Sequence, residues 1–553
     1  MRRRPAVSLR PVHGPPGFHG AFRTDEEARA LYAEGAGVYR ILPAAVAAPL
    51  DLDDLVSLVR WARASGQALV PRGAGSGMPG HNVGAGIVLD LRRGFREAAA
   101  VDAGSRTARA GAATTYRELN GAALAHGLRL PPDPSSGAFC TLGGMVGTNA
   151  AGAHSLRHGA MRRWVRALEF VTADGEVGRA LPHGRTAARE GGGTAAEQRF
   201  LRDIAPAIEA SQGELEARRP KARKNASGYD LLPPDDGGWV KNLLVGSEGT
   251  LAIVTAVEVG LATLPREVAT LLVALGDLAD LAPALDKLDA FEPEAVELLD
   301  RTFLDFVRAA AHASVPADTA AVLLVELEGD GRDAEAALHG FAARVVRADE
   351  PGAAGKLWET RHLASPILAG LPDHVRSLQI IEDGCVPRPR LGTYVAGLRR
   401  IARAHGFDVV IFGHAGDGHV HANVLADAGD PGLVARLLAC LDEVTRLQIA
   451  LGGTPSGEHG DGRLRAPYLP ALLGERYADL ARSVKRAFDP DGILNPGVKI
   501  AAGPALEAGN LKVGPAAPRV PRDVAEALRR IEKEAGYGLD RLSLVPAATP
   551  AGV

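Results

Sequence analysis

The sequence predicts an α+β protein built from two or three lobes. At 553 residues the chain exceeds the about 250 to 300 residues at which one hydrophobic core stops growing. Segments with apolar residues at helical spacing alternate with short apolar runs that are typical of strands. Hydrophobic residues make up 46% and charged residues 23%, which argues against extended disorder and against fibrous classes.

Charge and cysteine content exclude several classes of protein. The net charge of -3 gives no overall field that would attract a polyanion, so nucleic-acid binding is not expected. Cys140, Cys385 and Cys440 lie too far apart to indicate a disulfide framework or an iron-sulfur cluster.

The amino terminus has prolines where an export signal needs an apolar run, and no run of about 18 apolar residues follows anywhere. We therefore expect no membrane span and a cytoplasmic location.

The first lobe is predicted over residues 40–262, after an extension of residues 1–39. Residues 51–66 begin with acids, have apolar residues at helical spacing and end in glycine, which predicts a surface helix. QALVPR and GIVLDL are predicted strands on either side of a glycine-rich loop. ALEFVTADGEV predicts a hairpin, because Asp-Gly suits a tight turn. Residues 179–198 lack periodicity and are predicted to form a surface loop.

The second lobe is predicted over residues 263–482. Its helical segments include LAPALDKLDAF and GLRRIARAHGF, and its strands include TAAVLLVELEG and DVVIF. Residues 506–553 form a linker followed by an amphipathic helix, DVAEALRRIEKEAG, whose packing partner the pattern does not indicate.

Three glycine-rich segments of the first lobe predict a site for one large ligand. In PRGAGSG, residues 71–77, alternate glycines follow a strand, so that successive backbone N–H groups can converge on an anion such as a diphosphate. This spacing matches neither the Rossmann fingerprint nor a P-loop, and alone it favours an ordinary tight turn over a ligand site. TLGGMVGTNAAGAHSLRHG and GSEGT add further glycines, which let backbone wrap closely around a flat, polar ligand.

Two glycine-flanked runs of the second lobe concentrate histidines and acids. GHAGDGHVHAN and SGEHGDGR contain His414, Asp417, His419, His421, Glu458, His459 and Asp461. On a strand His419 and His421 project to one face, and His414 precedes a glycine turn that can fold back on either. Two histidines and a carboxylate leave open positions on a divalent metal, as a catalytic site requires. For any single histidine a surface or capping role is the favoured interpretation, but a cluster of this kind is hard to explain by packing.

These motifs together, in their order, resemble the FAD-linked oxidoreductases of the vanillyl-alcohol oxidase type. The resemblance rests on PRGAGSG, PPDPSS, TLGGMVGTNAAGAHSLRHG, KNASGYDL, GSEGTLAIVTAVEVGL and FDPDGILNPGVKI, and it covers about residues 40 to 500. The chain is most similar to the D-2-hydroxyacid dehydrogenase branch, which includes D-lactate, D-2-hydroxyglutarate and glycolate dehydrogenases. The resemblance implies a two-part FAD-binding domain, to which residues 483–505 return, and an α+β substrate (cap) domain.

The resemblance also implies which residues bind FAD. The PRGAGSG loop would hold the pyrophosphate through Arg72, Gly73, Ala74, Gly75, Ser76 and Gly77. The flavin and its tail would be lined by Pro134, Ser135, Thr141, Gly144, Asn149, Gly152, Glu248, Gly249 and Ile253, with Asn495 returning from the carboxyl end. Some relatives bind FAD covalently through a histidine; His81 and His154 lie near these loops, and we expect the non-covalent form.

In the second lobe the resemblance implies a divalent metal, zinc, held by His414, His421 and Glu458. His459 would be the general base, and His419 stands where related sequences often have asparagine. A 2-hydroxy acid that chelates the metal would lose its hydroxyl proton to His459 while the Cα hydride passes to flavin N5, which gives a 2-oxo acid.

Arg361 is the candidate partner of the substrate carboxylate, because a guanidinium fork can bind it through two hydrogen bonds. Relatives have an arginine in a similar W-x-x-R context, while a surface ion pair with Glu359 or another acid is an equal alternative. Ile381 stands where some relatives have the lysine that binds a second carboxylate, and Arg465 is a candidate substitute.

Two functions of other classes stay open at this point. One is a metallohydrolase built on the His/Glu cluster, and the other is a non-redox flavoprotein of the same fold. Larger relatives continue into a cysteine-rich iron-sulfur module. Electrons are therefore expected to pass to a separate iron-sulfur protein, an electron-transfer flavoprotein or a quinone, or to oxygen if the protein is an oxidase.

Overall fold

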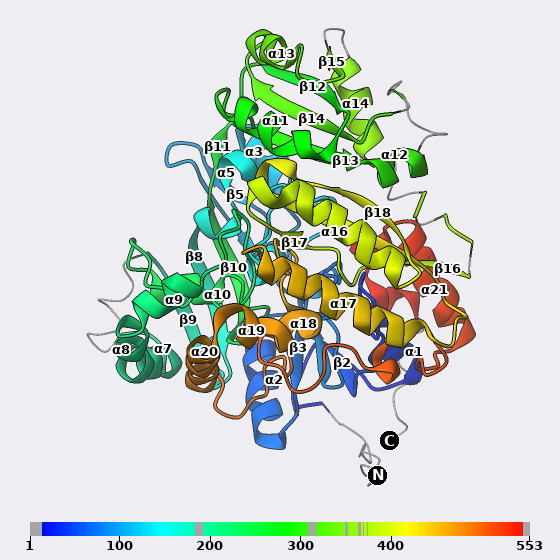
Figure 1. The fold of residues 1–553 in the computed structure, drawn as a ribbon. Coiled ribbons are helices and arrows are strands. Elements are labelled where there is room, and N and C mark those ends of the chain that lie inside the picture. Colours follow the sequence, from blue (N-terminus) through cyan, green and yellow to red (C-terminus); the bar gives the residue numbers. More distant parts are fainter. Residues whose placement is uncertain are drawn as a thin grey trace.

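A computed structural model of the chain describes residues 14–182, 192–307, 316, 318–348, 352–362, 367–368, 370–372 and 374–545. Helices are mixed with sheets of four, five, two and eight strands in these ranges, which confirms the α+β prediction. The eight-stranded sheet lies at the top of Figure 1 and the four-stranded sheet at the bottom.

The four-stranded sheet has the order β1-β2-β4-β3, in which β2, β4 and β3 are parallel to one another. Its strands are β1 (Ala21–Arg23), β2 (Ala45–Ala48), β3 (Leu69–Arg72) and β4 (Ile87–Asp90). The crossover between β2 and β3 is α2 (Leu52–Ser65), which Asp51 caps and Gly66 ends, as the sequence predicts. The glycine-rich loop begins at the carboxyl end of β3.

The five-stranded antiparallel sheet has the order β5-β6-β10-β8-β9. Its strands are β5 (Ala100–Asp102), β6 (Thr107–Gly111), β8 (Val165–Thr172), β9 (Val177–Ala180) and β10 (Ala252–Gly260). The β8–β9 pairing confirms the Asp-Gly hairpin. Two helices, α3 (Tyr116–Leu124) and α4 (Leu142–Thr148), pack on this sheet, and α4 belongs to the second glycine-rich segment.

The surface loop predicted over residues 179–198 is wrong at both of its ends. Strand β9 continues to Ala180, and α7 (Ala195–Arg199) begins at a capping box formed by Thr194 and Glu197. The Thr194 cap and the Glu197 side chain outweigh the glycine-rich composition on which the loop was predicted. Residues 183–191 of this segment lie outside the described part of the chain.

The eight-stranded sheet has the order β15-β12-β14-β13-β18-β19-β16, with β17 paired to β19. Its strands are β12 (Val268–Leu275), β13 (Ala295–Asp300), β14 (Ala321–Glu328), β15 (Arg344–Arg347), β16 (Val375–Leu378), β17 (Gly384–Cys385), β18 (Asp408–Gly413) and β19 (His419–Asp427). Alternate residues of β12 face opposite cores. One core includes α11 (Leu281–Asp289), α16 (Leu391–Ala404) and α17 (Leu433–Ala450), and the other includes α12 (Arg301–Val307) and α14 (Ala353–His362).

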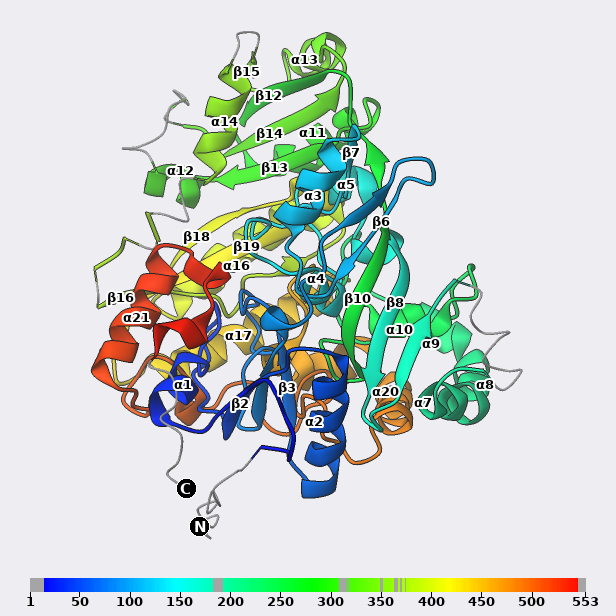
Figure 2. The same ribbon diagram turned by 180° about the vertical axis from the view of Figure 1, so that it is seen from behind.

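The chain returns to the first lobe after the eight-stranded sheet. Helix α20 (Glu475–Phe488) packs in the core of the five-stranded sheet. The backbone beyond it runs beside β3, where Asn495 donates its N–H to the Leu69 carbonyl at 2.8 Å. The helix predicted near the carboxyl end is α21 (Arg522–Lys533), which packs on α1 (Glu26–Leu31), as Figure 2 shows. Of the helices described, none combines the length and apolar character that a bilayer crossing needs.

Candidate active site

A cavity lies between the three glycine-rich segments of the first lobe. Most of the residues predicted to bind FAD line it, namely Arg72, Gly73, Ala74, Gly75, Ser76, Gly77, Pro134, Ser135, Thr141, Gly144, Glu248, Gly249 and Ile253. Asn149, Gly152 and Asn495 are not among the lining residues. Three segments that are far apart in the sequence therefore form one cavity wall.

The PRGAGSG loop is built for backbone to approach a ligand closely. At Gly75 φ is +78°, which L side chains rarely adopt, and an added Cβ would lie 2.3 Å from Nη2 of Arg72. A Cβ at Gly73 would lie 2.3 Å from Oγ1 of Thr141. The Arg72 guanidinium is buried below the loop and donates to the carbonyls of Tyr32, Glu34 and Asn82. Loop backbone that lines the cavity, with a buried guanidinium beneath it, fits the diphosphate of FAD.

The three residues off the cavity wall shape the loops behind it. Asn149 ends α4 with a φ of +52° and accepts the Arg162 N–H at 2.8 Å. Gly152 leaves no room for a side chain, since a Cβ would lie 2.2 Å from the Asp133 carbonyl oxygen. Asn495 donates its amide to the carbonyls of His81 and Glu248, at 2.8 Å each.

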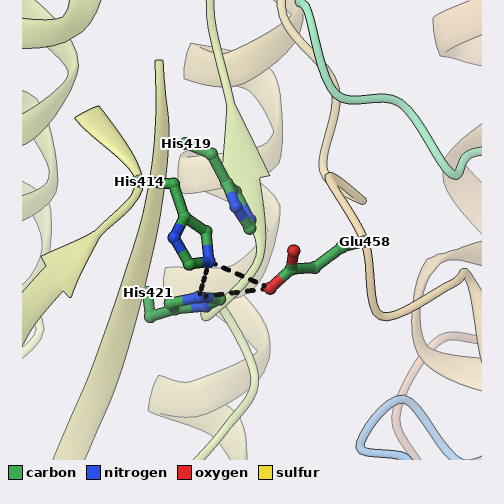
Figure 3. Close-up of side chains that lie close together, drawn as sticks. All are labelled: His414, His419, His421 and Glu458. Carbon is green, nitrogen blue, oxygen red and sulfur yellow. Dashed lines mark hydrogen bonds and ion pairs between the residues drawn. The ribbon is translucent and has the colours of Figure 1, made fainter. Parts of the chain in front are cut away.

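The histidine and acid runs of the second lobe converge, as Figure 3 shows. Strands β18 and β19 form a hairpin that places His414 at its turn and His421 on β19, and Glu458 comes from the loop after α17. Nε2 of His414 lies 3.3 Å from Oε1 of Glu458, Nε2 of His421 lies 3.4 Å from the same oxygen, and the two Nε2 atoms lie 3.4 Å apart.

The other nitrogen of each imidazole already has an acceptor. Nδ1 of His414 lies 2.5 Å from Oε1 of Glu297, and Nδ1 of His421 lies 3.0 Å from the carbonyl oxygen of Glu382. When both rings are neutral with the proton on Nδ1, the two Nε2 lone pairs face one carboxylate oxygen of Glu458. Two imidazole nitrogens and a carboxylate oxygen gathered in this way form a donor set that fits a divalent metal.

His419 belongs to the same cluster. It is fully buried, and its ligand atom lies within 4.8 Å of those of His414, His421 and Glu458. Its Nε2 lies 2.9 Å from Oδ1 of Asp383, while Nδ1 has no hydrogen-bond partner among the described residues. Burial lowers the pKa of His419 to about 3, so the ring is neutral.

His459 lies where the cluster meets the cavity. Both Glu458 and His459 line the cavity formed by the glycine-rich segments. Nδ1 of His459 lies 2.7 Å from Oε2 of Glu382, and its backbone N–H donates to Asp383 at 2.9 Å. Nε2 of His459 lies 3.7 Å from Oε1 of Glu458, which is beyond hydrogen-bond distance, so this edge of the ring can still meet a bound molecule.

The loop that carries Glu458 and His459 is bonded to the third glycine-rich segment. Glu248 accepts the N–H groups of Asp461 and Gly462 at 2.7 and 2.8 Å, and Nζ of Lys499 lies 3.0 Å from the same carboxylate. Glu248 has a φ of +54° and is buried. These bonds fix the histidine-bearing loop against the wall of the cavity.

Two family models match the chain. The model described as an FAD binding domain matches residues 43–180, and the one described as the C-terminal domain of FAD linked oxidases matches residues 264–498. A glycolate oxidase subunit GlcD of Bacillus subtilis is 30% identical over 499 residues, which are 88% of this chain and 94% of that protein. The chain belongs to the FAD-linked oxidases.

Other relatives of this FAD-linked oxidase differ in substrate and in length. A D-2-hydroxyglutarate dehydrogenase of Pseudomonas putida is 30% identical over 509 residues, 87% of this chain but 50% of that protein, so the chain spans half of its length. A D-lactate dehydrogenase of Archaeoglobus fulgidus is 30% identical over 458 residues, 82% of this chain and 90% of that protein. An alkyldihydroxyacetonephosphate synthase shares the fold at a TM-score of 0.58 and 17% identity, covering 86% of this chain and 83% of that one.

Arg361 of this FAD-linked oxidase reaches the histidine cluster through Glu297. Its Nε donates to Glu297 at 2.8 Å, and its guanidinium carbon lies 4.5 Å from the ring centre of Phe412. Glu297 thus lies between Arg361 and His414. The alternative interpretation of Arg361, an ion pair with an acid, is found in the structure, and the acid is Glu297. Arg465 is buried, donates to Glu382 at 2.5 Å and to the Gly460 carbonyl at 2.6 Å, and is not available for a second substrate carboxylate.

Three functional candidates lie outside the sequence prediction. Glu297 and Glu382 orient the imidazoles of His414 and His459, and Lys224 donates to Glu458 at 2.9 Å. Lys224 is the first residue of KNASGYDL, and Glu382 precedes Asp383 in SLQIIEDG. The family resemblance assigns a role to neither residue. A buried acid beside a histidine leaves no local pattern that sequence reading can detect.

Electrostatics set the protonation of these groups. Burial opposes ionisation of Glu458, but Lys224 and His414 hold its pKa well below the usual range. Burial likewise opposes the charged form of His459, yet Asp383 and Glu382 raise the pKa of His459 to about 10. Glu297 raises the pKa of His414 to about 9 in the same way. A divalent cation bound by His414, His421 and Glu458 would repel the protons on His414 and His459 and so lower the pKa of both histidines.

Proposed function

We propose that this FAD-linked oxidase converts a D-2-hydroxy acid to the 2-oxo acid. The observation that carries the proposal is that Glu458 and His459 line the same cavity as the glycine-rich segments. A substrate held there would lie beside both the flavin and a general base. The named activities of three relatives, on D-2-hydroxyglutarate, glycolate and D-lactate, support a 2-hydroxy acid as the substrate.

Each residue of the proposed site has one role. His414, His421 and Glu458 would hold a divalent metal, with zinc the best match to two imidazoles and a carboxylate. When bound, FAD takes up the Cα hydride with its two electrons and the metal ion lowers the pKa of the substrate hydroxyl. With its pKa lowered by the bound metal, His459 would accept the hydroxyl proton at Nε2, because Glu382 keeps the other proton on Nδ1.

Arg361 is proposed to bind the substrate carboxylate. Its Nε is bonded to Glu297, so the fork must present its terminal nitrogens to the substrate. The bond to Glu297 restricts the rotamers of the arginine and so lowers the entropy lost on binding. We expect Arg361→Lys to raise KM more than it lowers kcat, because a lysine supplies the charge without the fork.

A flavin-reduction assay without oxygen tests the function. The FAD-loaded protein is mixed with D-lactate, glycolate, D-2-hydroxyglutarate or D-malate, and the flavin absorbance is followed. At least one of the acids is expected to bleach the flavin, and its L enantiomer, where one exists, is expected to be slow. An intact flavin band after exposure to all four acids would overturn the proposal and would favour the non-redox flavoprotein.

Electron exit and location extend the proposal. We propose a separate iron-sulfur protein, an electron-transfer flavoprotein or a quinone as the acceptor, and a cytoplasmic location. Oxygen is the alternative acceptor, and re-oxidation of the bleached flavin in air within one turnover time would favour it. The metallohydrolase alternative loses its basis, because its premise was that the glycine-rich loops have only a structural role.

A further inference from the structure

The carboxyl-terminal part of the chain, beyond the family match that ends at residue 498, folds back onto the first lobe. Residues 536–542 follow α21, and we call them the carboxyl-terminal strap. Figure 2 shows this region in red beside α1. All residues of the strap lie in the described part of the chain, and none of them lines the cavity of the glycine-rich segments, the FAD cavity. A role of the strap in FAD binding must therefore act through the residues that it contacts.

The strap contacts three segments that carry residues of the cavity wall. The ring centres of Tyr537 and Phe139 lie 5.5 Å apart, and the residue after Phe139, Cys140, lines the cavity. Arg92 directly follows another wall residue and donates to the carbonyl oxygen of Leu539 at 2.5 Å. The third segment is the PRGAGSG loop, to which the strap is joined through a pair of buried arginines.

Arg541 of the strap lies next to Arg72, at the start of the PRGAGSG loop. Arg541 is 1% exposed and Arg72 is 2% exposed. Both guanidinium groups donate to the carbonyl oxygen of Glu34, each at 2.8 Å. Two residues further on, Ala36 donates its N–H to the carbonyl oxygen of Gly75 at 3.1 Å. The strap and the glycine loop are therefore bonded to the same short piece of backbone.

Neither of these guanidinium groups has a carboxylate partner. Arg72 and Arg541 form no ion pair with any described residue, and Nε of each has no hydrogen-bond partner there. The carboxylates of Asp90 and Glu34 act on the pair from farther away, and each is already bonded to another arginine, at 2.8 and 2.5 Å. Two buried positive charges are therefore left without an anion among the described residues.

The proximity of these two like charges is costly. Burial lowers the pKa of Arg72 well below its ordinary value, and the positive charge of Arg541 lowers this pKa further. Taking unpaired charges out of water costs folding free energy, which an anion would offset. The PRGAGSG loop is the proposed position of the FAD diphosphate, and Arg72 lines the cavity there. The negative charge of a diphosphate bound at this loop would compensate the pair.

We propose that Arg541 is a positioning residue for FAD, which strengthens the binding of the diphosphate by adding its buried charge to that of Arg72. Buried charges are screened much less than exposed ones, so a guanidinium at this depth can act from behind the loop without lining the cavity. The proposal rests on the proposed position of the diphosphate at the PRGAGSG loop and is independent of which acid the protein oxidises.

Hydrogen exchange tests this coupling without any substitution. Exchange of the backbone amides of residues 536–545 is measured by mass spectrometry on the FAD-loaded protein and on the protein from which FAD has been removed. We expect exchange in this segment to slow at least about threefold when FAD is bound, because the diphosphate stabilises the arginine pair and with it the strap. The control segment is α13 (Arg332–Leu338) in the second lobe, whose exchange should not depend on FAD.

Release of FAD from the loaded protein tests the role of the charge. Arg541→Gln removes the charge and keeps a donor, and we expect FAD to dissociate about tenfold faster after dilution, measured by the recovery of flavin fluorescence. Arg541→Lys keeps the charge and is expected to release FAD within about threefold of the unchanged rate. The matched control is Arg530→Gln, which removes an exposed charge of α21 and should release FAD at the unchanged rate.

A merely structural role of Arg541 predicts other results, because it depends on the carbonyl bonds and not on the charge. Equally fast release in the Gln and Lys variants, or an unchanged rate in Arg541→Gln, would overturn the proposal. Exchange of the strap that does not respond to FAD would overturn it as well, and this measurement decides the matter if Arg541→Gln does not fold. Neither measurement involves a 2-hydroxy acid, so a failure here is distinguishable from a failure of the flavin-reduction assay.

Discussion

The carboxylate of Glu382 lies 2.7 Å from Nδ1 of His459, and Arg465 holds the other oxygen of the same carboxylate at 2.5 Å. The pair fixes both the tautomer and the orientation of the proposed base. Glu382→Gln removes the charge but keeps the size. We expect the rate of flavin reduction to fall by about 10 to 100-fold, the loss typical of such orienting partners, with FAD content unchanged.

Rapid-mixing measurement of flavin reduction checks this expectation. A matched control is Glu443→Gln, which removes a carboxylate from His405, a histidine at the end of α16 with no part in the cluster. A Glu382→Gln protein that reduces its flavin at the full rate would show that His459 is oriented by other groups.

The metal proposal predicts a loss of bound metal without a loss of flavin. Glu458→Gln replaces the only carboxylate among the three proposed ligands, and His414→Ala removes an imidazole. We expect either change to lower the metal content by about tenfold or more, measured by elemental analysis after dialysis. His405→Ala serves as the control histidine. If neither Glu458→Gln nor His414→Ala lowers the metal content, the metal is bound elsewhere.

The glycine loop is expected to tolerate no side chain at Gly75. Its φ of +78° disfavours a Cβ, and the buried Arg72 guanidinium that the Cβ would meet is held by three carbonyls. Gly75→Ala should cost about 1 to 3 kcal/mol of local strain and should lower FAD occupancy, read from the ratio of flavin to protein absorbance. Gly121→Ala is the control, because a Cβ there meets nothing within 4 Å inside α3, and the change should be neutral or stabilising.

His154 makes the stability of the protein depend on pH. Its ring joins Asp133 of the first lobe, at 2.6 Å, to Glu326 of β14, at 2.9 Å. Burial disfavours the charged ring, but the two carboxylates raise the pKa of His154 from 6.5 to about 10. A raised pKa stabilises the folded state fully below pH 6.5, and the stabilisation is lost as pH rises from 6.5 to about 10.

Thermal unfolding at pH 6 and at pH 9.5 measures this effect. The Tm of the unchanged protein is expected to fall further over this interval than the Tm of His154→Asn. Each kcal/mol of lost stabilisation corresponds to roughly 2 to 4 °C in Tm. The variant should also unfold at a lower temperature at pH 6, because two carboxylates then face each other without a cation. Identical pH profiles for the two proteins would rule out His154 as the source.

Local signals were sufficient for most of the fold. The helix at residues 51–66 was predicted because its acidic start and terminal glycine are cap signals, and the β8–β9 hairpin because Asp-Gly specifies its turn. The packing of α21 on α1 was not predictable, since residues almost 500 positions apart share no local pattern. The loop predicted over residues 179–198 is wrong at its carboxyl end, because the capping box of Thr194 and Glu197 starts a helix that glycine-rich composition does not indicate.

The candidate site was predictable only in its innermost residues. Glycine density and histidine spacing indicated the two halves of the cavity, and the structure brings them together at Glu458 and His459. Glu297, Glu382 and Lys224 act on the histidines and on Glu458 from strands and loops that are distant in sequence. The domain boundaries and the roles of the individual site residues stay predictions.

Glu248 links the wall of the FAD cavity to the proposed metal ligands. Its carboxylate is bonded to the backbone of Asp461 and Gly462, so any movement of the third glycine-rich segment also displaces the segment that carries Glu458. If the proposed metal binds, FAD and the metal should therefore be taken up cooperatively. Thermodynamic reciprocity then requires that FAD raises the affinity for the metal by the same factor by which the metal raises the affinity for FAD.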